Sequence, residues 1–148
     1  MLHIAKRFSQ LNIGQILDLY CPPEEETELI CYLQEFFSAE DSMVAMWCVE
    51  GIVRSALRLE PYEDGYLLTA LKTQAEFRRK GYGSSLLSSV LKQLENLKIY
   101  SHVDKNNVAS IGLHKKCGFH IVSDHARFLD GSITYSHSTF CNKDTPIR

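Results

Sequence analysis

Several features that define common protein classes are missing from this sequence of 148 residues. It has no apolar stretch near the roughly 20 residues that a membrane-spanning helix needs, so we expect a soluble protein without a membrane partner. Its charges nearly balance, with 16 Lys and Arg against 18 Asp and Glu, and this balance argues against a protein that coats nucleic acid. Any basic surface must therefore be local.

The cysteines give no sign of a disulfide framework or a zinc ribbon. They are odd in number and are not spaced in pairs: Cys21, Cys31, Cys48, Cys117 and Cys141. The N-terminus also lacks an apolar run followed by a small-residue cleavage site. We therefore expect free thiols and a reducing, cytoplasmic setting. The length suits one globular domain that spans residues 1–148.

Hydrophobic periodicity predicts a chain in which strands and helices alternate in the order β-α-α-β-β-β-α-β-α-β-β. The unit around residues 66–103 reads as strand, helix and strand, which predicts a parallel pair inside an otherwise antiparallel sheet. Strands are expected in residues 1–8, 43–50, 52–60, 66–73, 98–103, 119–128 and 132–140, and helices in residues 11–20, 24–37, 86–97 and 106–119. Glu24, Glu25 and Glu26 have a structural explanation, because acidic residues in a first turn complement the helix dipole.

The segment between the third strand of the antiparallel run and the next helix combines three cations with two glycines: Arg78, Arg79, Lys80, Gly81 and Gly83. A glycine turn at a helix N-terminus exposes unpaired backbone N–H groups at the positive end of the helix dipole. The glycines let the backbone approach a phosphate closely, and the cations add charge. We predict a diphosphate site here, although a loop of solvated charges is the simpler alternative.

Two common diphosphate motifs do not fit this loop. The dinucleotide fingerprint needs a third glycine where this chain has Leu86, and no Gly-Lys-Ser/Thr closes a Walker loop. NAD and ATP are therefore disfavoured as ligands, and a nucleotide-binding domain is the weaker alternative.

The loop Arg78-x-x-Gly81-x-Gly83 instead resembles the Gln/Arg-x-x-Gly-x-Gly/Ala signature of the GNAT superfamily of acyl-CoA N-acyltransferases. One strand later, Asn107-x-x-Ser110-x-x-Leu113-His114-x-x-x-Gly118-Phe119 is similar to that family's Asn-x-x-Ala/Ser-x-x-Leu-Tyr-x-x-x-Gly-Phe helix. The predicted element order also matches the family over essentially the whole chain. The resemblance implies an α/β (α+β) fold with a single mixed, mostly antiparallel sheet, a splayed parallel strand pair and flanking helices.

The resemblance further implies acetyl-CoA as cosubstrate. Backbone N–H groups of residues 79–84 would bind its pyrophosphate, residues 71–73 would pair with its pantetheine through main-chain atoms, and Asn107 would hydrogen-bond the pantetheine or phosphate arm. A helix cap is the simpler role for Asn107. The expected coenzyme-binding residues are Leu71, Lys72, Thr73, Arg78, Arg79, Lys80, Gly81, Tyr82, Gly83, Ser84, Asn107 and Ser110.

Acetyl transfer to an amine needs a stabilised oxyanion and a proton for the leaving thiolate. The resemblance implies a backbone N–H at or near Leu71 as the oxyanion donor. His114 stands where the family has its usual general-acid tyrosine, and an imidazole can donate a proton near neutral pH. A helix-surface or semi-buried structural histidine is the alternative for His114, and Tyr100 and Tyr135 are alternative donors.

The general base is less well marked. Glu60, at the end of a predicted strand, is the first candidate, and a water chain that ends on His102 or a backbone carbonyl is the alternative. The acceptor is open, although six residues could face its pocket: Arg58, Tyr62, Tyr66, His102, Arg127 and Tyr135.

The spacing His114-x-x-Cys117-x-x-His120 does not make a convincing metal site, because Gly118 should end the helix within it. We expect no metal. The sequence thus predicts an N-acetyltransferase that moves an acetyl group from acetyl-CoA to a primary amine of a small molecule or peptide by direct attack in a ternary complex. A CoA-binding regulatory domain without the chemistry is the alternative, and a homodimer is possible in either case.

Overall fold

The computed structural model describes residues 1–143. One seven-stranded sheet organises the chain, in the order β1-β2-β3-β4-β5-β9-β6, and a separate two-stranded sheet pairs β7 with β8. The strands are β1 (Leu2–Ala5), β2 (Met43–Val49), β3 (Ile52–Tyr62), β4 (Gly65–Thr73), β5 (Ile99–Asp104), β6 (His120–Ser123), β7 (Ala126–Arg127), β8 (Ile133–Thr134) and β9 (His137–Cys141). The α-helices are α1 (Ile13–Tyr20), α2 (Glu26–Phe36), α3 (Tyr82–Gln93) and α4 (Val108–Lys116), with 3-10 turns η1 (Phe8–Gln10), η2 (Pro23–Glu25) and η3 (Ala75–Phe77).

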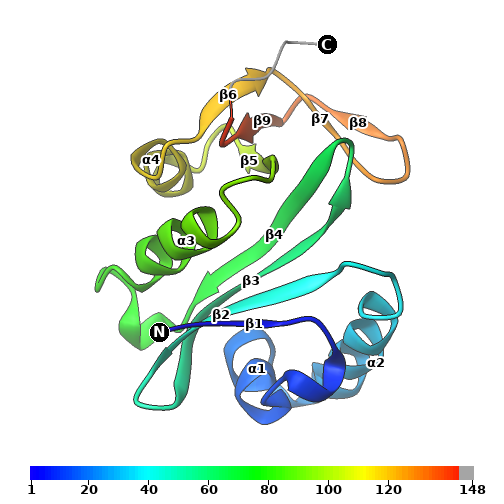
Figure 1. The fold of residues 1–148 in the computed structure, drawn as a ribbon, viewed down its shortest axis with the longest axis vertical. Helices are drawn as coiled ribbons and strands as arrows, with labels where there is room; N and C mark the ends of the chain where they lie inside the picture. The colour runs from blue at the N-terminus through cyan, green and yellow to red at the C-terminus, as the bar shows by residue number, and fades with distance from the viewer. Residues whose placement is uncertain (144–148) are drawn as a thin grey trace.

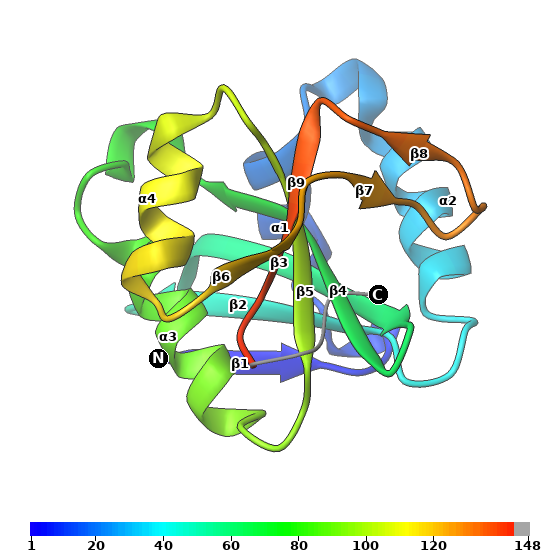
Figure 2. The same cartoon turned by 90° about the horizontal axis from the view of Figure 1, so that it is seen from above.

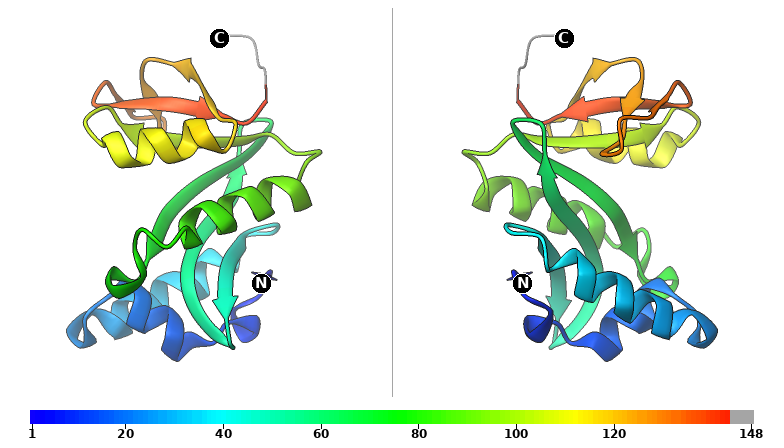
Figure 3. Two further views of the ribbon diagram at one scale, coloured as in Figure 1. Left: turned by 90° about the vertical axis from the view of Figure 1, so that its left-hand side faces the viewer. Right: turned by 90° about the vertical axis from the view of Figure 1, so that its right-hand side faces the viewer.

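The predicted fold class is confirmed. The β4–β5 pair is parallel, and the other neighbours in the large sheet are antiparallel. Figure 1 shows α3 and α4 on one side of the sheet and α1 and α2 on the other, and Figure 3 shows the same layers from the two sides. No helix within residues 1–143 combines the length and the apolar character required to cross a bilayer.

The core has two main parts because side chains alternate along β2 and β3. Ala45, Leu57 and Leu59 pack toward α3, where Leu86 and Val90 complete the first cluster. Val44, Met46, Val53 and Ala56 point to the opposite face and pack against α1 and α2 through Ile16, Leu19, Leu33 and Phe36. The strands at the centre are therefore held from both sides.

The parallel pair is short. Its register runs Tyr66↔Ile99, Leu67↔Tyr100 and Leu68↔Ser101, and then the two strands separate. β5 continues in contact with β9, while β4 continues along β3. The view in Figure 2 shows β4 and β5 diverging from a common end. The splayed pair expected from the sequence is thus present, and it leaves one edge of β4 without a strand partner among the described residues.

Three predicted elements were wrong in extent. The expected strands 119–128 and 132–140 each break into two, because local hydroxyl bonds turn the chain. Ser123 Oγ accepts the N–H of His125 at 3.3 Å, and Thr134 Oγ1 accepts the N–H of Ser136 at 3.3 Å. The helix expected over 86–97 ends at Gln93, and the chain then turns through a Leu97 N–H to Leu94 carbonyl bond.

Candidate active site

A bulge in β4 marks the centre of the candidate site. The register passes from Arg58↔Thr69 to Ala56↔Lys72, so β4 holds one more residue than β3 over this stretch. Ala70 lies in the bulge with φ 56, a left-handed conformation that costs an alanine about 1 kcal/mol. Strain of this kind persists only where surrounding packing fixes the chain, and it is concentrated at functional sites.

Past the short parallel pair, the edge of β4 that faced β5 has no strand partner among the described residues, and backbone N–H groups of β4 point to this edge. The N–H of Gln74 donates to the carbonyl of Arg54 on β3 at 3.1 Å. Because successive N–H groups along a strand alternate between its two edges, the N–H groups of Thr73 and Leu71 point to the opposite edge. This is the open edge of β4, and it is where a ligand can pair with the strand.

The glycine loop continues from the open edge into α3. Arg79 has φ 67 and Gly81 has φ 81, and α3 begins at Tyr82 without a side-chain cap or an acidic residue in its first turn. Within residues 1–143, the backbone N–H groups of residues 79–84 donate no hydrogen bond, and the first helical bond comes from Ser85 to Gly81 at 2.8 Å. The N-terminus of a 12-residue helix is thus free to bind an anion.

The cations beside this helix end are exposed, as the sequence predicted for a local basic surface. Arg78 Nε donates to the carbonyl of Thr73 at 3.4 Å, and Lys80 Nζ lies 5.4 Å from the centre of the Phe77 ring. Gly83 lies where α3 meets β4 and α4: a Cβ there would come within 3.4 Å of Thr73 Oγ1 and 3.9 Å of Leu113 Cδ2. The predicted cradle residues are therefore gathered at one end of α3.

Asn107 caps α4. Its side-chain oxygen accepts the N–H of Ser110 at 3.0 Å, which confirms the helix cap expected from the sequence. The residue is exposed, so its amide nitrogen remains accessible. The coenzyme role of Asn107 and Ser110 stays a prediction.

His114 is a buried residue with both ring nitrogens engaged. The residue is only 2% exposed, and its ring packs edge-on against Phe119. Nδ1 lies 2.7 Å from the carbonyl of Ser110, which can only accept, so Nδ1 carries the hydrogen and Nε2 accepts from the Ser101 hydroxyl at 2.9 Å. Burial lowers the pKa of the imidazole, although the Ser110 hydrogen bond opposes this shift.

These contacts explain His114 structurally and leave its proton committed to Ser110, so the general-acid role stays a prediction. The alternative donors lie away from the bulge. The Tyr100 hydroxyl donates to Asp64 at 2.5 Å near the turn between β3 and β4, and Tyr135 is 69% exposed beside the ring of His125.

Glu60 lies on the same face of β3 as Arg58, opposite Leu67 of β4. The carboxyl is half-buried, and burial raises its pKa while the charge of Arg58 lowers it. A carboxyl with a raised pKa is better suited to accept a proton near neutral pH. It does not line the cavity described next, so the role of Glu60 as base also stays a prediction.

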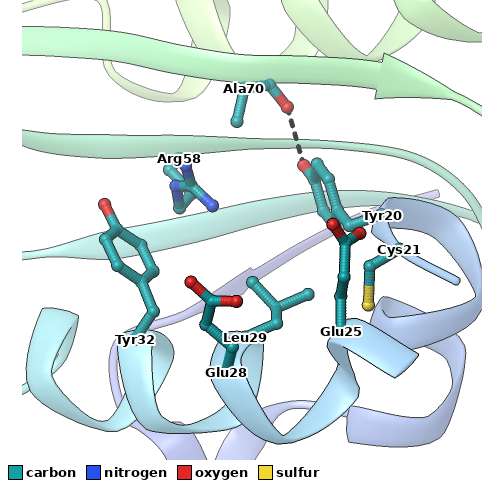
Figure 4. Close-up of a pocket in the computed structure, with 8 residues that line it drawn as sticks. All are labelled: Tyr20, Cys21, Glu25, Glu28, Leu29, Tyr32, Arg58 and Ala70. Carbon is teal, nitrogen blue, oxygen red and sulfur yellow. Dashed lines mark hydrogen bonds between the residues drawn. The ribbon is translucent and has the colours of Figure 1, made fainter. Parts of the chain in front are cut away.

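A cavity of about 360 Å³ lies between the helices α1 and α2 and the strands β3 and β4. Figure 4 shows Glu25, Glu28 and Tyr32 reaching in from the α2 side and Arg58 from the sheet. At its inner end, the Tyr20 hydroxyl donates to the carbonyl of Ala70 at 2.8 Å. The cavity and the open edge of β4 thus meet at the bulge, from opposite sides of the same strand.

Sequence reasoning missed most of this cavity. The sequence predicts residues 11–20, which include Tyr20, only as a helix, and it explains Glu25 only through the dipole of the next helix. Arg58 alone was among the residues expected near a pocket. Burial strongly raises the pKa of the Tyr20 hydroxyl, against the charge of Arg58, so this side chain is a neutral hydrogen-bond donor.

Comparison with known families identifies the chain. The model of the acetyltransferase (GNAT) family matches residues 13–119. The chain is a member of the GNAT acetyltransferase family. This assignment confirms the resemblance of the two motifs, since the matched residues include both the glycine loop and the α4 helix.

Solved structures confirm the GNAT fold at low sequence identity. Aminoglycoside 6'-acetyltransferase type Ii has a TM-score of 0.70 and 16% identity, with 99% of each chain covered. PaiA N-acetyltransferase from Thermoplasma acidophilum, solved in complex with coenzyme A, has a TM-score of 0.65 and 14% identity over 97% of this chain and 99% of that one. The ribosomal-protein-S18-alanine N-acetyltransferase from Escherichia coli has a TM-score of 0.64 and 16% identity over 95% and 91%. No curated protein matches the chain by sequence.

Proposed function

We propose that this GNAT protein is an N-acetyltransferase that transfers the acetyl group of acetyl-CoA to a primary amine. The observation that carries the proposal is the position of the Ala70 bulge. On one side of it lies the open edge of β4, which leads to the glycine loop, and on the other lies the cavity with Tyr20. A thioester and an amine that enter from these two sides would meet at the bulge.

The coenzyme half of the proposal rests on backbone donors. Residues 79–84 offer N–H groups at the start of α3, and the exposed cations Arg78, Arg79 and Lys80 add charge for a pyrophosphate. The open-edge N–H groups of Leu71 and Thr73 would pair with the amide groups of pantetheine. The coenzyme A bound to PaiA, which has the same fold, supports this assignment.

The transfer itself follows from the chemistry of a thioester. The amine nitrogen attacks the acetyl carbonyl carbon, and a backbone N–H at or near Leu71 stabilises the oxyanion that forms. The carbon–sulfur bond then breaks and its electron pair leaves with sulfur. The nitrogen loses one proton, the sulfur gains one, and the products are an amide and the free CoA thiol.

The two proton transfers are the least supported steps. Glu60 remains the predicted base, acting through water because it lies outside the cavity, and its raised pKa supports that role. His114 remains the predicted acid, but its burial and its two hydrogen bonds favour a structural role. An unaided thiolate can take its proton from solvent.

Thermal melting and thiol release test the proposal together. Melts with acetyl-CoA, CoA, ATP and NAD should shift only with the two CoA species, and a ligand at a hundred times its Kd adds about 2.7 kcal/mol of stability. Thiol release should then appear with at least one amine of a broad panel. No shift with CoA would overturn the proposal. A CoA shift without thiol release from any amine would favour the regulatory CoA-binding domain.

Three expectations stay predictions. The single domain was assigned to residues 1–148, of which residues 144–148 lie outside the described part of the chain. The cytoplasmic setting rests on sequence alone, through the cysteine pattern and the residues at the N-terminus. The homodimer rests on the resemblance to the family.

A further inference from the structure

Arg58 has an unusual environment in the cavity. Its Nε is buried and has no hydrogen-bond partner. The guanidinium donates no hydrogen bond to, and forms no ion pair with, any residue in 1–143. Two aromatic rings lie beside it, with Cζ 4.8 Å from the centre of the Tyr32 ring and 6.0 Å from that of Tyr20, and its charge acts against the burial that raises the pKa of Glu60 on the same face of β3. A guanidinium with a buried Nε and no hydrogen-bond partner among the described residues is suited to bind an anion, and its planar fork matches a carboxylate.

Arg54, on the same strand, provides a contrast. Its Nε is also buried and unpartnered, but its Nη1 donates to the side chain of Gln74 at 3.0 Å, and its guanidinium stacks on Phe77 at 3.7 Å. The guanidinium of Arg54 is therefore already engaged by other side chains of the protein. Arg58 has no such polar partner among the described residues, and it lines the cavity.

The position of Arg58 relative to the bulge limits the distance between an anionic group bound to Arg58 and an amine that reacts at the bulge. Arg58 is opposite Thr69 in the β3–β4 register, so it is next to the bulge residue Ala70. Tyr20, which bonds the Ala70 carbonyl, lies within 6.0 Å of the Arg58 guanidinium, measured from its ring centre. A ligand that touches both Arg58 and the bulge therefore needs its carboxylate and its amine only a few atoms apart.

The other charges of the cavity lie nearer to solvent. Glu25 and Glu28, on η2 and α2, are exposed, whereas Arg58 is half-buried on the sheet. Figure 4 shows both carboxylates on the α2 side of the cavity, across from Arg58. Neither forms an ion pair with a cation in residues 1–143. They are placed to attract a cationic group on the outer part of a ligand.

We propose that the acceptor is a basic α-amino acid. Its carboxylate binds Arg58, and its α-amine lies at the Ala70 bulge. Its cationic side chain extends toward Glu25 and Glu28. This inference rests on the proposed acetyltransferase function and specifies its acceptor. It disfavours polyamines, which carry no anionic group for Arg58 and would leave the half-buried guanidinium facing another cation. The acetylated product would be an Nα-acetylamino acid.

The test compares amines that differ only in the carboxylate. L-arginine is paired with agmatine and L-lysine with cadaverine, and kcat/KM for thiol release is measured with saturating acetyl-CoA. The wild-type enzyme should prefer the amino acid of each pair on the order of a hundredfold, because the decarboxylated analogue leaves Arg58 unpaired. Binding of all four amines to the CoA-bound protein is measured in parallel by calorimetry, which needs no turnover.

Arg58→Gln is the decisive variant, and Arg7→Gln, at an exposed position outside the cavity, is its matched control. Arg58→Gln should reduce the preference for the amino acid to less than about threefold while the CoA-induced melting shift stays unchanged, whereas Arg7→Gln should keep the full preference. Equal or better use of agmatine and cadaverine, an unchanged preference in Arg58→Gln, or binding of none of the four amines would overturn the proposal. Failure of the acetyltransferase function is distinct, since it appears as the loss of the CoA shift or as the absence of thiol release with every amine of the broad panel.

Discussion

At the scale of single residues, the site depends on one alanine in a glycine-like conformation. Ala70 turns its carbonyl toward α1, where the buried Tyr20 hydroxyl fixes it at 2.8 Å. This hydrogen bond gives a reason why the strained bulge persists, because an unpaired buried carbonyl and hydroxyl would both lose stability. Tyr20 thus connects the acceptor cavity to the strand that would hold the thioester.

Replacing Tyr20 with Phe should remove that connection. We expect Tyr20→Phe to lower the free energy of unfolding by about 1 kcal/mol, since it deletes one buried hydrogen bond and leaves the Ala70 carbonyl unpaired. Turnover should fall further than this stability loss explains, because the bulge would relax. Urea unfolding and steady-state kinetics measure the two effects. Tyr135→Phe, at a 69% exposed position, is the control, and a Tyr20→Phe enzyme with wild-type kcat would contradict the link.

A substitution of His114 can distinguish a structural role, which its burial favours, from the general-acid role, which its position in the motif predicts. Because both ring nitrogens are engaged, we expect His114→Gln, whose amide can replace one donor and one acceptor, to keep turnover within about tenfold of wild type. A general acid at this position requires a loss of roughly a hundredfold or more. Single-turnover rates with CoA affinity measured alongside decide between the two. A hundredfold loss with intact coenzyme binding would establish the predicted acid.

At the scale of elements, the helices were predictable and the short C-terminal strands were not. The stripes of α1 and α2 and the Asn107 cap of α4 are local signals, and each was found from the sequence. The breaks after Ser123 and Thr134 depend on side-chain hydroxyls that bond to nearby backbone. Serine and threonine also occur in ordinary strands, so their presence does not announce such a turn.

The glycine loop yields a prediction because its Gly81 can be compared with a glycine inside a helix. Gly81 has φ 81 at the start of α3, whereas Gly112 lies within α4, outside the positive-φ region, with open space around it. Gly81→Ala should lower the stability by about 1 kcal/mol and weaken CoA binding, since an alanine resists the left-handed conformation that directs the N–H groups. Gly112→Ala should instead raise the stability by about 0.5–1 kcal/mol with CoA affinity unchanged.

Unfolding curves and CoA titrations of both variants provide the comparison. Tight CoA binding by Gly81→Ala would show that the conformation of this glycine is dispensable for the cradle.

Two substitutions of Asn107 can distinguish its structural role as the cap of α4 from its predicted role in coenzyme binding. Asn107→Asp keeps an oxygen for the Ser110 N–H, so its stability should stay within about 0.5 kcal/mol of wild type, while Asn107→Ala should lose about 1 kcal/mol. If the Asn107 amide also donates to the coenzyme, Asn107→Asp should still weaken CoA binding, because a carboxylate has no N–H and repels phosphate. Calorimetry of CoA binding decides, and equal affinity in all three proteins would leave Asn107 a cap alone.

At the scale of the whole molecule, the two halves of the site differ in how far the sequence could predict them. The coenzyme loop is continuous in sequence, so its glycines and cations could be recognised directly. The cavity joins Tyr20, Glu28, Arg58 and Ala70 from four separate elements, and only the folded sheet brings them together. No local pattern distinguishes Arg58, which has no polar partner among the described residues, from Arg54, which has one.

One buried and one half-buried histidine should make the fold sensitive to mild acid. Burial lowers the pKa of His114 and of His102, whose ring nitrogens contact Thr139 and the Arg127 carbonyl. Below about pH 6.5 the unfolded chain therefore binds protons that the folded chain does not, and stability falls with pH until the folded pKa values are passed. Each group contributes at most about 1.4 kcal/mol per pH unit in this window.

Denaturant unfolding at pH 7.5, 6.5, 5.5 and 4.5 measures this loss. His114→Gln removes one of the two groups, so its stability should depend less steeply on pH below 6.5 than that of the wild type, whatever its stability at pH 7.5. His3→Gln, at an exposed position, should keep the full slope. Asp64 acts in a separate and lower window, because hydrogen bonds from Lys98 and Tyr100 lower its pKa to about 2. A slope unchanged by His114→Gln would mean that His114 takes up its proton over the same pH range in the folded and the unfolded chain, and the same result would reopen its role as the acid.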